Sequence, residues 1–111
     1  MTTLTETEFN QKMDDTIIAI EEALDDLDEL DIDYETSGGI LTITLENGSK
    51  VIINRQTPLK QLWLAAKDGG YHLDWKDGQW LTDKDQEPLK ILLNRVLSQQ
   101  SGETVSLELR I

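Results

Sequence analysis

Apolar residues recur at spacings of three and four near both ends of the chain, and at spacings of two in the region between. The N-terminal series predicts one buried stripe of an amphipathic helix, formed by Phe9, Met13, Ile17, Ile20, Leu24 and Leu27. Thr5 and Glu8 have the spacing of a capping box, which predicts that the helix begins there. Ile18 falls outside the stripe, so we expect it to be exposed.

The central region alternates as short strands separated by turns. The predicted strands cover residues 31–35, 40–45, 50–54, 61–66, 71–75 and 79–82. Asn47-Gly48 is a strong hairpin signal between the second and third of them. A second helix is predicted over about residues 88–100, and Val105, Leu107, Leu109 and Ile111 alternate as a short final strand.

This order of elements predicts an α+β fold in one domain, residues 1–111. Two helices pack on one face of an antiparallel sheet, which makes a two-layer α-β sandwich. A chain of 111 residues has the usual size of one domain.

Composition excludes several classes of function. The chain has no cysteine, which rules out disulfides, thiolate catalysis and iron–sulfur clusters held by its own thiolates. The sequence pI near 4.2 argues against binding to nucleic acid, whose phosphates require lysine and arginine. No apolar run approaches the roughly 20 residues of a membrane span. The first residues resemble neither a signal peptide nor a transit peptide.

The whole net charge of −12 comes from the first 35 residues, which hold 13 acidic residues and one lysine. Acidic and basic residues balance at nine each in the remainder. Like charges at i,i+4 on the first helix, such as Glu21/Asp25 and Glu22/Asp26, each cost about 0.2–0.5 kcal/mol. Carboxylates near a helix C-terminus also oppose its dipole. The simplest alternative is a solvated helix surface, but this cost favours a functional role.

Carboxylates are hard oxygen ligands suited to Mg²⁺, Ca²⁺, Mn²⁺ or iron. In a row and exposed, they predict several weak and exchangeable metal sites. The same negative field would also steer a basic protein surface toward this segment.

The open face of the sheet carries a second candidate site. Alternation turns Leu62 and Leu64 inward and leaves Gln61 and Trp63 outward, beside Asn54. An outward tryptophan is a typical anchor for a protein partner. The alternative is that Arg55 or a loop covers Trp63.

Enzymatic chemistry finds little support. His72 and Asp74 share one face of a strand, but no serine or threonine is placed beside them as a nucleophile. A ferroxidase would need a dinuclear site, and no helical Glu-x-x-His motif is present. We therefore expect a protein that is not an enzyme.

Several stretches resemble the frataxin family, and specifically the small bacterial frataxins of the CyaY type. The similarity covers roughly residues 5–105. It is carried by the acidic first helix and by four segments: residues 31–35 (DIDYE), 39–43 (GILTI), 54–65 (NRQTPLKQLWLA) and 69–74 (GGYHLD).

The resemblance implies a frataxin-like fold and a role as regulator or iron donor in iron–sulfur cluster assembly. It implies weak binding of Fe²⁺ or Fe³⁺, with no organic cofactor, and binding to a cysteine desulfurase and an iron–sulfur scaffold protein. The implied iron and desulfurase site is an acidic ridge of Glu21, Glu22, Asp25, Asp26, Asp28, Asp31, Asp33 and Glu35. The implied scaffold site is a sheet patch of Asn54, Gln56, Gln61 and Trp63.

Further expectations and one alternative follow from the resemblance. We expect a bacterial cytoplasmic protein that is monomeric, with oligomerisation in the presence of iron left open. The alternative is a pure interaction module that regulates the desulfurase and binds metal only incidentally.

Overall fold

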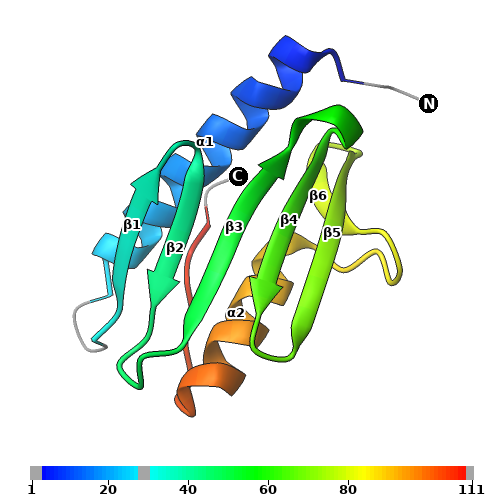
Figure 1. Ribbon diagram of the computed structural model, residues 1–111. Coiled ribbons are helices and arrows are strands. Elements are labelled where there is room, and N and C mark those ends of the chain that lie inside the picture. Colours follow the sequence, from blue (N-terminus) through cyan, green and yellow to red (C-terminus); the bar gives the residue numbers. More distant parts are fainter. Residues whose placement is uncertain (1–3, 28–30, 110–111) are drawn as a thin grey trace.

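The computed structural model describes residues 4–27 and 31–109 and has two layers (Figure 1). Six antiparallel strands lie side by side in chain order. They are β1 (Asp33–Ser37), β2 (Ile40–Thr44), β3 (Lys50–Gln56), β4 (Gln61–Ala66), β5 (Gly69–Lys76) and β6 (Gln79–Thr82). The helices α1 (Glu6–Asp25) and α2 (Leu89–Ser101) cover one face, and a short 3₁₀ helix, η1 (Thr57–Leu59), joins β3 to β4. The predicted α+β sandwich is confirmed.

Helix α1 begins where the capping box predicts. Thr5 accepts a hydrogen bond from the Glu8 backbone amide at 3.1 Å, and the Glu8 carboxylate accepts one from the Thr5 amide at 2.9 Å. The apolar stripe from Phe9 to Leu24 is buried, and Ile18 is 51% exposed, as expected. The helix ends at Asp25, so Asp26 lies just beyond it. Within the described residues, neither helix is long and apolar enough to cross a membrane.

The two faces of the sheet divide as alternation predicts. The core face carries fully or almost fully buried aliphatic side chains, which are Leu41, Ile43, Leu45, Val51, Ile53, Leu62, Leu64 and Leu73. The other face is not covered by either helix (Figure 1). The register pairs Asn54 with Trp63 and Trp63 with His72, so these three residues form one row across that open face.

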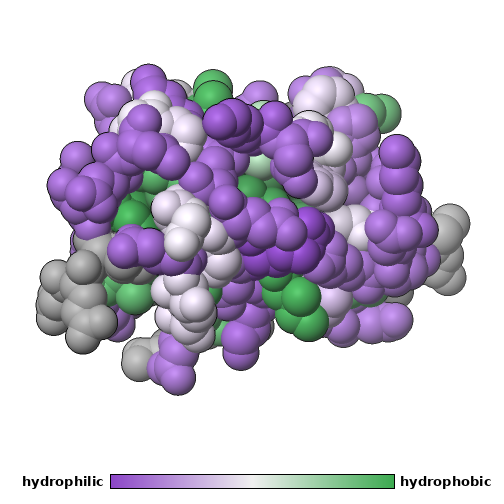
Figure 2. All heavy atoms as spheres, turned by 90° about the horizontal axis from the view of Figure 1, so that it is seen from below, coloured by the Kyte–Doolittle hydropathy of each residue, from purple (hydrophilic) through white to green (hydrophobic). Residues whose placement is uncertain are grey.

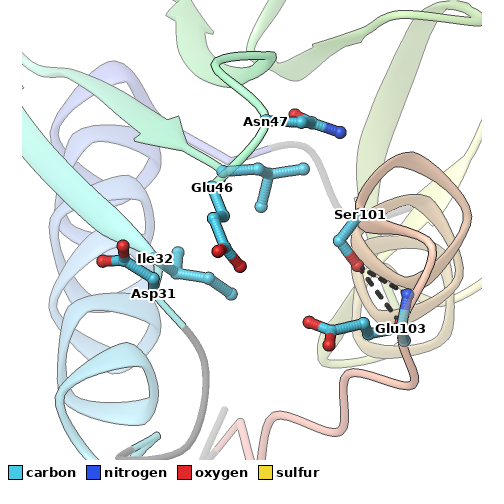
Figure 3. Close-up of a pocket in the computed structure, with 7 residues that line it drawn as sticks. Asp31, Ile32, Glu46, Asn47, Ser101 and Glu103 are labelled. Carbon is cyan, nitrogen blue, oxygen red and sulfur yellow. Dashed lines mark hydrogen bonds between the residues drawn. The ribbon is translucent and has the colours of Figure 1, made fainter.

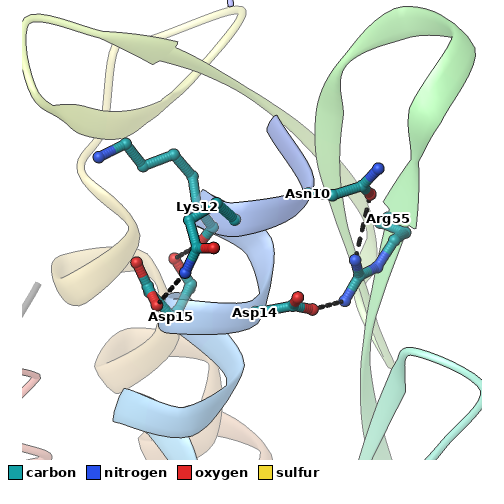
Figure 4. A network of polar contacts seen from close by, with 7 residues as sticks. Asn10, Lys12, Asp14, Asp15 and Arg55 are labelled. Carbon is teal, nitrogen blue, oxygen red and sulfur yellow. Dashed lines mark hydrogen bonds and ion pairs between the residues drawn. The ribbon is translucent and has the colours of Figure 1, made fainter. Parts of the chain in front are cut away.

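Arg55 joins the sheet to α1 on the core side (Figure 4). Its guanidinium donates to Asp14 Oδ1 at 2.7 Å and to Asn10 Oδ1 at 3.2 Å. Its buried Nε has no hydrogen-bond partner among the residues that the structure describes. The backbone of Gly39 has φ +80°, and a Cβ there would lie 3.1 Å from this Nε. The turn between β1 and β2 therefore requires glycine both for its conformation and for the close approach of Arg55.

The predicted final strand is wrong in the part that the structure describes. Val105, Leu107 and Leu109 are buried in alternation, but residues 104–109 join no strand. The segment runs along α2. Because the backbone groups of a helix are already hydrogen-bonded within it, the backbone of the segment bonds to side chains of α2 instead. The Leu107 amide donates to Asn94 Oδ1 and the Val105 amide to Ser98 Oγ, both at 2.8 Å.

Candidate functional site

The acidic ridge, defined as the eight carboxylates named above, divides into separate groups in the structure. Asp28 lies outside the described residues. Glu21 and Asp25 face β1, and each accepts a hydroxyl hydrogen bond from it. Thr36 Oγ1 donates to Glu21 Oε2 at 2.6 Å, and the Tyr34 hydroxyl donates to Asp25 Oδ1 at 2.8 Å. These bonds tie the last turns of α1 to the edge strand of the sheet.

The contact with Asp25 also sets the ionisation of Tyr34. The hydrogen bond to this carboxylate raises the pKa of Tyr34, because it stabilises the protonated phenol. Slight burial and the negative charges of Asp25 and Glu21 act in the same direction. The phenol is therefore a neutral donor to the ridge at ordinary pH.

Glu22 and Asp26 lie farther round α1, because successive residues of a helix are about 100° apart. They line a hollow of about 230 Å³ with Asp15, Ile18, Ala19, Ala23 and Glu108. Glu108 comes from the C-terminal segment, which packs beside α2. Sequence reasoning missed Glu108 because nothing in the local pattern of that segment shows which helix it lies near.

Asp33 and Glu35 point to the open face of the sheet. Their neighbours in β1, Tyr34 and Thr36, face α1, so alternation turns the two carboxylates away from it. In the register they pair with Thr44 and Thr42 of β2. The prediction that the carboxylates of this strand share one face agrees with this arrangement, although the strand begins at Asp33 rather than residue 31.

Asp31 precedes β1 and lines a different hollow, of about 390 Å³ (Figure 3). Glu46 of the β2–β3 turn and Glu103 after α2 extend their carboxylates toward the same space. Seen from this end, the molecule is mostly hydrophilic, and apolar residues show only in small areas between polar side chains (Figure 2).

In residues 4–27 and 31–109, no group of three or more histidine, cysteine, aspartate or glutamate side chains is close enough to hold a metal ion. The described part of the ridge thus offers carboxylates singly or in neighbouring pairs along an edge. Asp14, about two turns before Glu21 on α1, already forms an ion pair with Arg55. The assignment of individual metal ligands stays a prediction.

The second candidate site, the sheet patch of Asn54, Gln56, Gln61 and Trp63, is brought together by the β3–β4 register. Asn54 pairs with Trp63, and Gln56 pairs with Gln61. All four side chains are partly exposed. The tryptophan indole Nε1 donates to Gln61 Oε1 at 2.9 Å, and Gln61 Nε2 donates to Asp74 Oδ1 at 3.1 Å. The patch is therefore a connected polar surface around one aromatic ring.

His72, and not Arg55, covers one face of Trp63. The imidazole stacks on the indole with ring centroids 4.3 Å apart and planes inclined by 16°, whereas Arg55 points to the core side. Sequence reasoning set His72 aside because no nucleophile accompanies its pair with Asp74, and it began β5 at Tyr71. The structure closes the β4–β5 hairpin with Lys67 and Asp68 and pairs Ala66 with Gly69, which brings His72 beside Trp63.

Comparison with known proteins shows which family this fold and sequence belong to. A family model for a frataxin-like domain matches residues 2–103. Frataxin from Psychromonas ingrahamii, a member of the CyaY protein family, is 38% identical with a TM-score of 0.85, and the match covers 93% of this chain and 97% of that one. Trimeric frataxin from the yeast Saccharomyces cerevisiae, complexed with ferrous ion, is 23% identical with a TM-score of 0.67, over 93% of this chain and 91% of that one.

The yeast similarity concerns the fold, whereas the bacterial frataxin shares fold and sequence over nearly its whole length. With a family model that spans almost all of the chain, these findings show that the protein belongs to the frataxin family.

Proposed function

We propose that this protein binds iron weakly and acts as a regulator or iron donor in iron–sulfur cluster assembly, without enzymatic activity of its own. The observation that carries this proposal is the gathering of unneutralised carboxylates at the α1–β1 edge. Family membership supports it. We place the protein in the bacterial cytoplasm as a monomer.

The ridge would bind iron through hard oxygen ligands, with water completing the coordination. Carboxylates spread along an edge favour several exchangeable sites over one rigid site. Among the described ridge carboxylates, five accept no hydrogen bond from another side chain within the described residues, namely Glu22, Asp26, Asp31, Asp33 and Glu35. They are the carboxylates most available to a cation.

The two surfaces suit two different protein partners. The ridge would attract a basic surface of the cysteine desulfurase, and its field would speed their encounter in a salt-dependent manner. The sheet patch, with its amides around Trp63, would contact the iron–sulfur scaffold protein. Tryptophan at the centre of such a patch is a common source of binding free energy.

The test compares two variants that remove the same charge from different places. The ridge double variant combines Glu22→Gln with Asp26→Asn, and the control double variant combines Asp77→Asn with Asp85→Asn. Anaerobic Fe²⁺ titration and a desulfurase pull-down at low and high salt would be run on both. We expect the ridge variant to bind both Fe²⁺ and the desulfurase more weakly and the control to bind both as the wild type does. Equal behaviour of the two variants would contradict the ridge assignment.

A second candidate function is a pure interaction module whose metal binding is incidental. It is favoured by the lack of any three-ligand group among the residues that the structure describes. The same pull-down separates the two functions when it is repeated with Fe²⁺ and with a chelator. Regulation by iron predicts that added Fe²⁺ changes desulfurase binding or activity, and a pure interaction module predicts no change.

A further inference from the structure

His72 is the only histidine of the chain, and it forms part of the surface around Trp63. Its imidazole covers one face of the indole, whose edge is held by Gln61. The register sets the two residues directly opposite each other on β4 and β5. A partner that covers the exposed part of the Trp63 ring therefore also contacts His72.

Two carboxylates lie near this imidazole. Asp83, which follows β6, has its Oδ2 3.9 Å from His72 Nδ1, and both side chains are close to half exposed. Asp74 lies two residues along β5 on the same face, but one of its oxygens accepts a hydrogen bond from Gln61. The elements packed beside His72 contribute the uncharged Trp63 and Gln61 from β4. Among the described residues, neither carboxylate forms an ion pair with a lysine or arginine.

We propose that His72 makes docking on the sheet patch depend on pH. This inference rests on the proposed function of that patch as the scaffold site. Histidine is the side chain that ordinarily changes charge between pH 5 and 8. With a neutral imidazole, the patch presents two stacked uncharged rings among amides.

Protonation changes what a partner must cover. The imidazolium is attracted both to the face of Trp63 and to the carboxylate of Asp83, while its charge remains hydrated on the exposed side. A partner that covers the ring pair must remove that hydration, and a charged group loses more free energy on desolvation than a neutral one. Docking therefore selects neutral His72 and weakens as pH falls.

The experiment measures the Kd for a purified apo scaffold protein between pH 5.5 and 8 at constant ionic strength. Because one proton is involved, we expect Kd to rise by up to tenfold for each pH unit below the titration of His72. The matched variant is His72→Phe, which keeps a stacked ring and cannot be protonated. Whatever its affinity at pH 8, it should lose this part of the pH dependence. An equal pH dependence in the variant, or tighter wild-type binding at low pH, would overturn the inference.

A second measurement needs no partner and separates this inference from the proposed function. The indole N–H resonance of Trp63 and the ring protons of His72 would be followed by NMR over the same pH range. We expect the Trp63 resonance to titrate with the same midpoint as the imidazole. A Trp63 resonance that ignores the imidazole titration refutes the inference. If Trp63 and His72 titrate together but the scaffold protein binds at no pH, the coupling between the two rings is real. The sheet patch is then not the scaffold site, and pH-dependent docking is refuted with it.

Discussion

Replacement of Trp63 by alanine tests both the assignment of sheet faces and the role of the patch. Trp63 and Leu62 are neighbours on β4 that point in opposite directions. Leu62 is 0% exposed on the core side, whereas Trp63 is partly exposed on the open side. The two alanine variants should therefore differ in kind: one empties the core, and the other removes a surface contact.

The magnitudes follow from the contacts of each side chain. Leu62→Ala should cost about 2–5 kcal/mol of unfolding free energy, because a fully buried leucine leaves a cavity. Trp63→Ala removes the stack on His72, worth about 0.5–1.5 kcal/mol, and one hydrogen bond, worth about 0.5–1.5 kcal/mol. Both contacts are partly exposed, which favours a total of about 1–2 kcal/mol.

Thermal and urea unfolding measure these differences. An unfolding entropy of about 2.1 cal/mol/K per residue over 111 residues makes 1 kcal/mol equal to about 4 °C in Tm. We expect Tm to fall by about 4–8 °C for Trp63→Ala and by about 8–20 °C for Leu62→Ala. Trp63→Phe, which keeps a ring for the stack, should cost less than Trp63→Ala. Equal destabilisation by the two alanine variants would mean that the faces are assigned wrongly.

Binding gives the complementary result. Trp63→Ala should weaken scaffold binding by about 2 kcal/mol, or roughly 30-fold, if this tryptophan anchors the interface. Fe²⁺ binding should persist, because the ridge lies on α1 and β1. Scaffold binding unchanged by this variant would remove Trp63 from the proposed interface.

Three further predictions concern the ridge, one turn and one cap. The ridge double variant should raise the unfolding free energy by about 0.2–0.5 kcal/mol in low-salt urea titrations, because it removes one like-charge i,i+4 pair; a clear loss would show that these acids are structural. Gly39→Ala should lower Tm more than Gly38→Ala, because both have positive φ but only Gly39 is backed by a close side chain; equal Tm values would refute the packing argument. The pKa of Glu8 lies below its ordinary value because its carboxylate accepts the backbone hydrogen bond of the cap. The ionised Glu8 carboxylate therefore stabilises the fold above about pH 4.5, and this stabilisation is lost as pH falls through the lower folded pKa. Glu8→Ala should be destabilising at pH 7 and nearly neutral at pH 2. An equal loss of unfolding free energy at both pH values would refute this linkage.

Local rules were sufficient for most of the fold. Strand β4 and strand β6 have the predicted bounds, and the first helix begins at the predicted capping box. These elements are determined by short-range chemistry, namely side-chain alternation, glycine turns and a cap. The core faces followed from the same alternation, because a slip of one residue would have exposed every buried aliphatic side chain.

Features that depend on distant packing could not be predicted. The alternation of Val105 and Leu107 is the same in a strand as in an extended segment against a helix. The two cases differ in the hydrogen-bond partners of the backbone, which here are the side chains of Asn94 and Ser98. The cover of Trp63 by His72 likewise depends on the register across the β4–β5 turn. Sequence reasoning began this strand at residue 71, two residues late, and so did not predict that His72 pairs with Trp63.

The division of the ridge shows the same limit and has a consequence for metal binding. Helical phase separates Glu21 and Asp25 from Glu22 and Asp26, but only packing shows that the first pair meets Tyr34 and its strand. A carboxylate that already accepts a hydroxyl must share or lose that bond to coordinate a cation. The pair without such donors should therefore bind first, so substoichiometric Mn²⁺ should broaden the NMR signals of Glu22 and Asp26 before those of Glu21 and Asp25. Broadening in the reverse order would mean that the hydroxyls of β1 help to build the site instead of competing with it.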